Sequence, residues 1–509
     1  FMEASGAPAL SGGGAERKRA NTSSAKDGKR KRRPGGKEES NIITPEWESG
    51  QLEAGHPYGV KPAGNGLYES GSEDGVVANI LDTSLGALRA IDDSLLLSIL
   101  ERLPPAALSR LSAASRGAYA FAHHPNLWQQ VVLSTLGGRF RFSGNWKDTF
   151  LRTKVGGEAR HTPLQIGCCF SDALHDPWIG AALQVDPRWL AVESVDRRKN
   201  LSVDEFISRY ETPGVPVIIT DVASKWPAMK EWTREQLARK YADKEFRVAA
   251  TVDMRLDDFL HYTERACDER PLYLFDKDFC VKCPEMEGQY AVPAHFSEDL
   301  MRVLGSDRPD YRWLLFGPAR SGSNFHVDPN CNFAWNATIQ GAKKWLFYPP
   351  HVRPPGVVAC GPGGEYQQQE VSLIQWFLKH YDEDDDGRER RLECISRPGD
   401  IVYVPRGWWH CVLNLEDSVA LAQNVVTERN LLAVTDFLED ALPCPPGRGC
   451  KGGDPDVPTS VIFPYRRPDI SDAPGISDIS GTSGVVSGIS GVASEDVSRA
   501  GGGGGVADA

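Results

Sequence analysis

The chain lacks the long apolar runs that membrane proteins need. None of its stretches approaches the roughly 20 apolar residues of a membrane-spanning helix, and the first residues lack the apolar core of a secretory signal. Its eleven cysteines are scattered and odd in number, which is unlike a disulfide framework and favours a reducing compartment. We therefore expect a soluble intracellular protein, and 509 residues leave room for two or three domains.

Bulk positive charge is lacking as well, since the formal net charge is −12 at pH 7. This balance argues against nucleic-acid binding by the folded part. The first forty residues differ, because they hold ten basic and five acidic side chains. The basic clusters Arg17–Arg19 and Lys29–Arg33 resemble a bipartite nuclear import signal, so we expect a nuclear location, alone or together with a cytoplasmic one. Nonspecific contact with nucleic-acid phosphates is expected only from this arm, and a solvated tail is the alternative.

Both ends of the chain lack apolar periodicity. Residues 1–85 and 443–509 are rich in Gly and Ser, and neither segment has enough apolar area to offset the entropy of ordering. We therefore predict a disordered basic arm and a disordered low-complexity tail. The stretch Asp382–Arg391 is acidic and then basic, and is expected to form a solvated loop. Its alternative role is an acidic rim that attracts a basic peptide such as a histone tail.

Two histidines and a carboxylate stand out in the remaining sequence. His326 and Asp328 are two residues apart, so in an extended strand both side chains project to the same side. His410 follows a Gly-Trp-Trp stretch and must arrive from a distant strand. Two histidines and one carboxylate are the ligand set of non-haem Fe(II) oxygenases, which leaves metal positions open for other ligands. Each residue alone is weak evidence, and the bland alternative is a satisfied histidine or a surface carboxylate.

A buried cation is predicted just downstream. Residues 332–340 indicate a strand, Gly341 a turn, and residues 343–348 a second strand that ends at Pro349-Pro350. Lys343 shares a face of that strand with Trp345 and Phe347, and a lysine in such a place is costly unless an anion meets it. A dicarboxylic acid would supply the anion. The alternative places Lys343 at the sheet edge in solvent.

Further strands surround His410. Residues 397–400 form a turn signature before a short apolar strand at 401–405, and residues 411–415 and 418–424 form two more strands. On the last strand Ala422 and Asn424 belong to a small-and-polar face that suits the lining of a pocket, although small residues also serve packing. Residues 371–381 indicate a helix inserted in the barrel, with Trp376 and Phe377 on its core face.

The segment from about residue 201 to 424 resembles a jumonji-C (JmjC) oxygenase. Within that family it is most similar to the subgroup of the phosphatidylserine-receptor-like arginine demethylase and lysyl hydroxylase. The likeness extends beyond the metal motif and keeps the subgroup's order along the chain. It is carried by Leu201–Tyr210, Pro271–Asp276, Tyr311–Trp313, Gly317–Gly322, Trp335–Ala337 and Gly407–Leu415.

The resemblance implies a role for each matching residue. His326, Asp328 and His410 would be the catalytic iron ligands, Lys343 would pair with the distal carboxylate of 2-oxoglutarate, and Tyr273 would hydrogen-bond to that carboxylate. The implied cofactors are Fe(II), 2-oxoglutarate as cosubstrate, and O₂. The protein would then supply geometry, charge and exclusion of water, while the oxidising power belongs to the metal.

Three more cosubstrate-binding residues are implied by the same likeness. These are Asn336, Ser323 where the subgroup often has threonine, and Asn424 near the metal-facing end of the pocket. Ala422 departs from the pattern, because the subgroup has a hydroxyl residue there that helps to bind 2-oxoglutarate. Its loss removes about 0.5–1.5 kcal/mol of hydrogen bonding, which weakens cosubstrate binding without abolishing it.

A second resemblance lies upstream, at about residues 86–135. Asp92, Asp93 and Ser94 supply a helix N-cap, leucines follow at helical spacing, and Pro104-Pro105 breaks that helix. This stretch resembles an F-box, which implies a Skp-type adaptor of a cullin–RING ubiquitin ligase as partner. The alternative is a small helical hairpin packed on the catalytic domain.

We therefore predict an α+β multidomain protein. Its core is a double-stranded β-helix, a cupin-like jelly-roll barrel at about 311–426 within an oxygenase domain at 191–442. An F-box at 86–135 and a linker at 136–190 precede this domain, and a helical piece near 427–442 closes it. The expected function is hydroxylation or N-demethylation of lysine or arginine in proteins such as histones. The alternatives are a ligase subunit whose barrel only binds substrate, and an oxygenase that acts on RNA.

Overall fold

The computed structural model describes residues 56–69, 78–157, 159–249, 251–360, 365–368, 372–383 and 391–441. The chain divides into two parts, residues 1–50 and 51–509, and every described residue belongs to the second. The predicted basic clusters and the predicted tail lie outside the described residues, as does most of the acidic-then-basic loop. Among the described residues, no helix combines the length and the apolar character needed to cross a bilayer.

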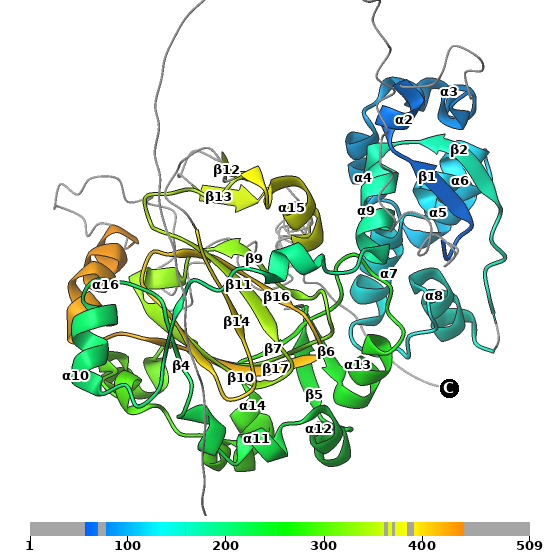
Figure 1. Ribbon diagram of the computed structural model, residues 1–509. Helices are drawn as coiled ribbons and strands as arrows, with labels where there is room; N and C mark the ends of the chain where they lie inside the picture. The colour runs from blue at the N-terminus through cyan, green and yellow to red at the C-terminus, as the bar shows by residue number, and fades with distance from the viewer. Residues whose placement is uncertain are drawn as a thin grey trace, which may run out of the picture. The chain divides into compact units, whose positions relative to one another are not determined.

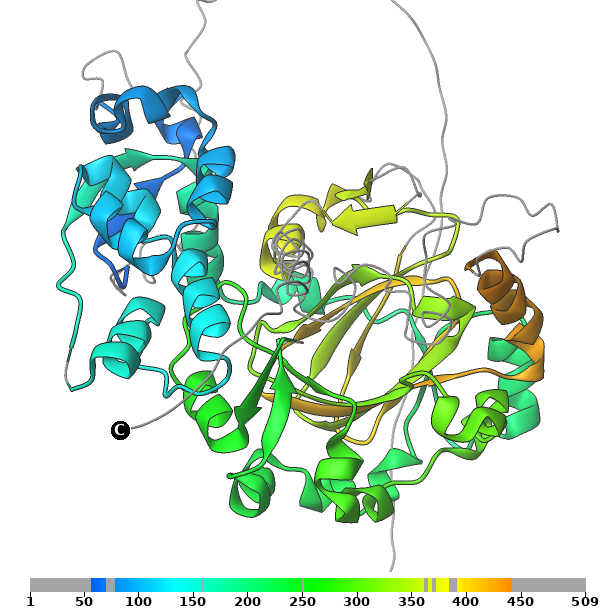
Figure 2. The same cartoon turned by 180° about the vertical axis from the view of Figure 1, so that it is seen from behind.

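Two facing sheets form the centre of the molecule (Figures 1 and 2), which confirms the predicted cupin-like barrel. The larger sheet has the strand order β3 (Asp196–Arg198), β4 (Val217–Ile219), β15 (Ile401–Val404), β10 (Phe333–Gln340), β17 (Ser418–Val425), β8 (Arg312–Gly317), β7 (Leu274–Asp276), β5 (Glu245–Val248) and β6 (Val252–Arg255). The smaller sheet has the order β14 (Leu392–Ser396), β11 (Lys343–Tyr348), β16 (Trp409–Asn414) and β9 (Gly322–His326). Neighbouring strands are antiparallel in both sheets, except for the parallel pair β3 and β4.

Strand β10 illustrates how residue alternation builds the layers. Ala334 faces the interior between the sheets, where it joins Trp345 and Phe347 of β11 in one apolar cluster. Trp335 and Ile339 point the other way, into the core beneath the helices that cover the large sheet. Successive side chains of a strand lie on opposite faces, so both faces of a central strand must be apolar to be covered. The helices on the outer face are α10 (Val203–Phe206), α11 (Ala228–Glu231), α12 (Arg234–Tyr241), α13 (Leu256–Thr263) and α14 (Phe279–Lys282).

A helix and a hairpin pack against the small sheet. Helix α15 (Leu373–His380) packs against it with the hairpin of β12 (Val357–Cys360) and β13 (Glu365–Gln368). The predicted helix at 371–381 is therefore confirmed, and its predicted core residues Trp376 and Phe377 are buried. Helix α16 (Glu428–Ala441) follows β17, where a helical piece was predicted.

Two N-terminal helices begin where the sequence predicts. Helix α4 (Asp93–Leu100) is capped by Asp92, whose carboxylate accepts hydrogen bonds from the backbone N–H groups of Ser94 and Leu95. Pro105 is the first residue of the next helix, where a missing N–H has no cost. The helices that follow α4 are α5 (Pro105–Ser112), α6 (Arg116–Ala122) and α7 (Pro125–Leu136).

Residues 136–190 are not a linker, contrary to the prediction. They contain α8 (Trp146–Val155), β2 (Ile166–Phe170) and α9 (Asp172–Ala182), with Trp146 and Leu174 buried. Part of the predicted disordered arm is also folded, as α2 (Asn65–Glu69), α3 (Ile80–Ser84) and β1 (Val60–Ala63). Strand β1 pairs in parallel with β2, about a hundred residues away. Sequence patterns are local, so a strand of four residues with a remote partner leaves little signal.

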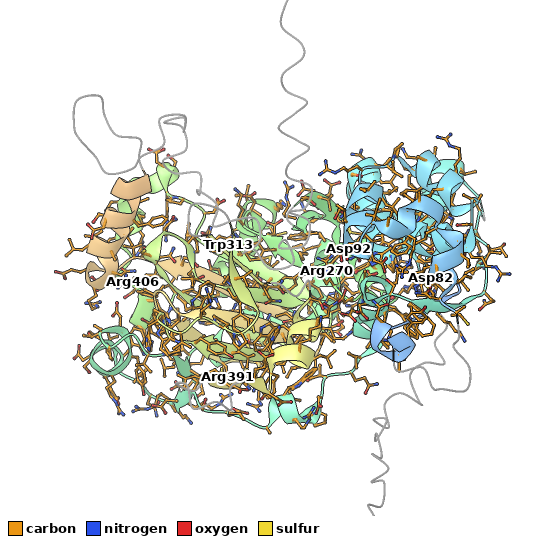
Figure 3. All side chains as sticks on the ribbon, turned by 90° about the horizontal axis from the view of Figure 1, so that it is seen from above. Asp82, Asp92, Arg270, Trp313, Arg391 and Arg406 are labelled. Atoms are coloured by element: carbon orange, nitrogen blue, oxygen red, sulfur yellow. The ribbon has the colours of Figure 1, made fainter. Side chains whose placement is uncertain are left out.

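The helical unit, residues 56–190, is tied to the barrel domain that follows it by polar contacts. The indole Nε1 of Trp146 donates to Asp268 Oδ1 at 2.8 Å, and Arg141 forms ion pairs with Asp257 and Asp258. Figure 3 shows Arg270 where the unit that bears Asp92 meets the barrel. Burial raises the pKa of Asp268, so the hydrogen bonds that it accepts from Trp146 and Tyr262 compensate for desolvation. One apolar cluster runs through both the helical unit and the barrel domain.

Candidate metal and cosubstrate site

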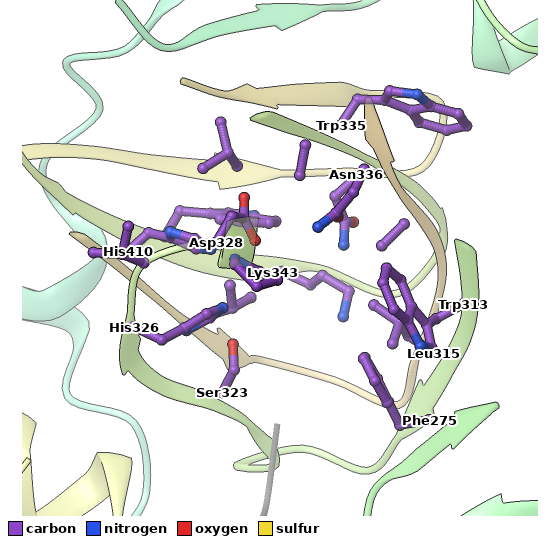
Figure 4. A pocket seen from close by; sticks show the side chains of 18 of the residues that line it. Phe275, Trp313, Leu315, Ser323, His326, Asp328, Trp335, Asn336, Lys343 and His410 are labelled. Carbon is purple, nitrogen blue, oxygen red and sulfur yellow. The ribbon is translucent and has the colours of Figure 1, made fainter. Parts of the chain in front are cut away.

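Three ligand side chains meet at one end of the paired strands β9 and β16 of the small sheet. Strand β9 ends at His326, which lies directly opposite His410 on β16, and the two imidazole ring centroids are 4.1 Å apart. Asp328 follows two residues after His326 (Figure 4). One nitrogen of each histidine and one oxygen of Asp328 all lie within 4.8 Å of one another. Within the described ranges, no other group of three His, Cys, Asp or Glu side chains is so arranged.

The hydrogen bonds of the two histidines leave the Nε2 atom of each ring available to a metal. Nδ1 of His326 lies 2.8 Å from the carbonyl oxygen of Asn324, and Nδ1 of His410 lies 3.1 Å from that of Trp408. A carbonyl only accepts, so each Nδ1 carries the proton and each Nε2 keeps its lone pair. Burial lowers the pKa of both imidazoles to about 4, so both are neutral at pH 7 and ready to coordinate.

The third ligand of the site is the carboxylate of Asp328. Burial raises the pKa of Asp328 to about 6, and its buried Oδ2 has no hydrogen-bond partner among the described residues. A buried carboxylate oxygen without a partner is costly, and a divalent cation would remove that cost. The donor set of two imidazoles and one carboxylate suits Fe(II). These residues therefore fit the metal that the sequence implies.

Lys343 lies deep in the same pocket with uncharged partners. It is 1% exposed, and its Nζ donates to the hydroxyl of Tyr273 at 3.2 Å and to Asn414 Oδ1 at 2.8 Å. Burial without a counter-charge lowers the pKa of Lys343 to about 7. The alternative of a solvated lysine at a sheet edge is wrong, because β11 lies between β14 and β16. A carboxylate bound beside Lys343 would raise the pKa of this lysine again and keep its ammonium charged.

The remaining predicted cosubstrate residues line this pocket as well. Tyr273, Ser323, Asn336 and Asn424 surround it together with Lys343 and the three ligand residues. In the part of the chain that the structure describes, nothing hydrogen-bonds to the buried Oδ1 of Asn336, which is a second polar atom available to a ligand. The structure thus brings together every site residue named from the sequence.

The small-and-polar face of β17 lines the pocket at one end. Ala422 and Asn424 line it, and Ala422 lies across from Asn336 on one neighbouring strand and Trp313 on the other. Ser418, near the start of the strand, instead donates to backbone carbonyls of the adjacent turns. Ala422 thus lines the pocket but offers no hydroxyl to a ligand, as the sequence predicts.

Comparison with known proteins places the chain in a family. The profile of the cupin-like domain matches residues 203–425. The chain is 41% identical over 387 residues to the arginine-specific demethylase JMJ22 of Arabidopsis thaliana, an alignment that covers 75% of this chain and 76% of that protein. The chain belongs to the JmjC family of cupin-like oxygenases.

Two other relatives align with less of this JmjC protein. The bifunctional arginine demethylase and lysyl-hydroxylase psr-1 of Caenorhabditis elegans is 34% identical over 252 residues, which cover 47% of this chain and 62% of psr-1. The human 2-oxoglutarate and iron-dependent oxygenase JMJD4 is 27% identical over 271 residues, which cover 47% of this chain and 63% of JMJD4. The alignment with JMJ22 is longer than the cupin-like domain alone, so it extends beyond the barrel.

Sequence reasoning did not assign a role to several residues of the JmjC site. Phe275 and Trp313 stack with ring centroids 5.4 Å apart and line the pocket opposite the metal ligands (Figure 4). Trp313 belongs to the Tyr-Arg-Trp stretch of the family resemblance, which was the available signal. Asn414 contacts Lys343, although the two are 71 residues apart in the chain, and only the pairing of β11 with β16 brings them together.

Proposed function

We propose that this JmjC protein is an Fe(II)- and 2-oxoglutarate-dependent dioxygenase that hydroxylates or N-demethylates arginine or lysine side chains of proteins such as histones. The observation that carries the proposal is the meeting of three ligand atoms within 4.8 Å beside the buried Lys343. The relatives named as arginine demethylases and as a lysyl-hydroxylase support this class of substrate.

Each residue of the site has a part in this proposal. His326, Asp328 and His410 would hold the iron, and Lys343 with Tyr273 would bind the distal carboxylate of 2-oxoglutarate. Iron with this cosubstrate and O₂ supplies the oxidation of a substrate C–H bond. Asn336, Ser323 and Asn424 would line the cosubstrate's path. Trp345, Val404 and Val412 form an apolar wall that excludes water from the reacting groups.

The aromatic pair suits a side chain with a cationic or N-methylated end. Phe275 and Trp313 present stacked ring faces opposite the ligand residues, and ring faces attract guanidinium and ammonium groups. A hydroxylated N-methyl group would release formaldehyde and leave the demethylated nitrogen. A hydroxylated side-chain carbon would remain as a stable alcohol, so the position of the substrate carbon decides between the two outcomes.

The test is substrate-dependent turnover of 2-oxoglutarate to succinate with histone-derived arginine and lysine peptides. We expect turnover by the full chain and none by His326→Ala, because two ligands do not retain iron. Leu432→Ala changes an exposed residue on α16 and is the matched control. Mass spectrometry of the peptide would show a gain of one oxygen or a loss of one methyl group. Iron uptake without turnover of any peptide, but with turnover of RNA oligonucleotides, would contradict the protein substrate.

We propose a second role, as partner of a Skp-type adaptor, from the surface of α4. Leu95 and Ile99 lie one helical turn apart and are 56% and 42% exposed, whereas Leu96 and Leu100 on the same helix are buried. Binding of a purified adaptor, lost in Leu95→Asp with Ile99→Asp but kept in Leu432→Asp, would support this role. Unchanged binding by the double variant would contradict it.

A nuclear location is proposed from the two basic clusters of the N-terminal arm. The spacing of Arg17–Arg19 and Lys29–Arg33 supports import, and the described residues do not include them. Replacing the second cluster by alanines in a fluorescent fusion should shift the protein to the cytoplasm. A distribution that does not change would contradict the proposal.

A further inference from the structure

Asn414, at the end of β16, is a fully buried residue whose backbone and side chain are both held by hydrogen bonds. Its backbone N–H donates to the carbonyl of Ser321 at 2.8 Å, and its carbonyl accepts from the N–H of Arg320 at 2.7 Å. Its side-chain Nδ2 donates to Ser321 Oγ at 2.8 Å, and its Oδ1 accepts from Lys343 Nζ at 2.8 Å. These bonds determine both the position and the orientation of the amide.

The amide orientation determines where the lysine ammonium lies. An ammonium has three N–H donors. In Lys343 one is directed at Asn414 Oδ1 and one at the hydroxyl of Tyr273, which leaves the third for a ligand of the cavity that Lys343 lines. A carboxylate needs this donor at a defined place, because charge-assisted hydrogen bonds are short and directional.

The loop that holds Asn414 is itself fixed from outside the barrel. Arg320 has a left-handed backbone with φ of 70°, and its guanidinium donates to the carbonyl of Gly180 on α9 at 3.0 Å. Ser321 Oγ donates to the carbonyl of Pro318 at 2.5 Å while it accepts from Asn414. The amide therefore has little freedom to turn away from Lys343.

We propose that Asn414 is a positioning residue for 2-oxoglutarate: its side-chain oxygen, oriented by Ser321, directs the Lys343 ammonium at the distal carboxylate. This inference rests on the proposed use of 2-oxoglutarate. The neutral amide suits the task better than a carboxylate would. A carboxylate at this place would pair with the ammonium itself and compete with the incoming carboxylate for it.

The test is a double-mutant cycle on the full chain, read by calorimetric binding of 2-oxoglutarate in the presence of Mn(II), so that no turnover is involved. Asn414→Asp keeps the shape of the side chain and should weaken binding roughly 10- to 100-fold, the range of one charge-assisted hydrogen bond. Ser321→Ala should weaken it less, because it only releases the amide. In the Lys343→Ala background, Asn414→Asp should have almost no further effect, since the residue acts through the lysine.

The matched control is Asn430→Asp, another buried asparagine, which does not line the pocket and whose Oδ1 accepts from the backbone N–H of Thr427. It should leave binding unchanged. Equal losses from Asn414→Asp in both backgrounds would show a merely structural residue and overturn the inference. Should Asn414→Asp fail to fold, unchanged binding by Ser321→Ala would overturn it instead. If the unmodified chain binds Mn(II) but no 2-oxoglutarate, the proposed function itself fails, which is a different result.

Discussion

At the scale of the residue, Ala422 offers a direct test of the cosubstrate pocket. Its methyl group lines the pocket between Asn336 and Trp313. Ala422→Thr adds a hydroxyl there, and one added hydrogen bond of about 0.5–1.5 kcal/mol should lower the KM for 2-oxoglutarate roughly 2- to 10-fold. Steady-state succinate formation measures this value. Ala422→Val is the control of equal shape, and equal effects of the two variants would show that shape and not hydrogen bonding was responsible.

Lys343 gives the site a pH dependence whose sign follows from its pKa. In the free protein burial lowers this pKa to about 7, and a bound carboxylate would raise it. Binding therefore takes up a proton, so affinity for 2-oxoglutarate is full below pH 7 and falls as pH rises through and above that value, by up to about tenfold per pH unit. Calorimetry between pH 6 and 9 with Mn(II) bound measures this slope. Lys343→Arg stays charged throughout and should give a flat profile, and an equally steep profile in that variant would assign the slope to another group.

At the scale of the element, β11 has two adjacent lysines that face opposite sides of the sheet and have different roles. Lys343 faces the pocket, whereas Lys344 points away and pairs with Glu393 Oε2 at 2.6 Å, both side chains being buried. Lys344→Met removes a cation that pairs with the buried Glu393 carboxylate, so it should lower the free energy of unfolding by about 3 kcal/mol. Lys343→Met removes a lysine whose charge burial disfavours, so it should cost little stability but markedly weaken 2-oxoglutarate binding.

Urea unfolding and calorimetric binding, measured on both variants, separate these two tasks. Each variant is the control for the other, because the substitutions are identical and the positions adjacent. The same loss of stability in both would contradict the assignment of faces along β11.

The same strand shows what can be predicted from sequence and what cannot. Local motifs were sufficient for His326, Asp328, Lys343 and the strands that bear them, because strand periodicity and turn residues lie within a few positions of each other. The partner strand of each element is not a local property. Asn414 therefore received no role, and the folded segment 136–190 was predicted as a linker, although Trp146 within it is buried.

At the scale of the whole molecule, the helical unit is part of the core of the oxygenase. The apolar cluster that contains Trp128 and Trp146 continues to Tyr262 and Phe316 beneath the large sheet. Trp146 also donates to the buried Asp268. A shared apolar core couples the unfolding of the elements that pack into it. We therefore expect the amides of residues 116–136 and 333–340 to lose protection from hydrogen exchange in a single cooperative transition.

Two tryptophan variants test this cooperativity through hydrogen-exchange mass spectrometry in urea. Trp146→Phe leaves Asp268 without one donor and should lower the unfolding free energy of both segments by the same amount, about 1–3 kcal/mol. Trp232→Phe is the matched variant within the oxygenase domain, where the indole nitrogen donates to Gln289. In a cooperative molecule it also lowers protection of residues 116–136, which it does not touch. If Trp232→Phe affects only residues 333–340, the helical unit folds on its own, and a separate adaptor-binding domain becomes the better description of residues 86–135.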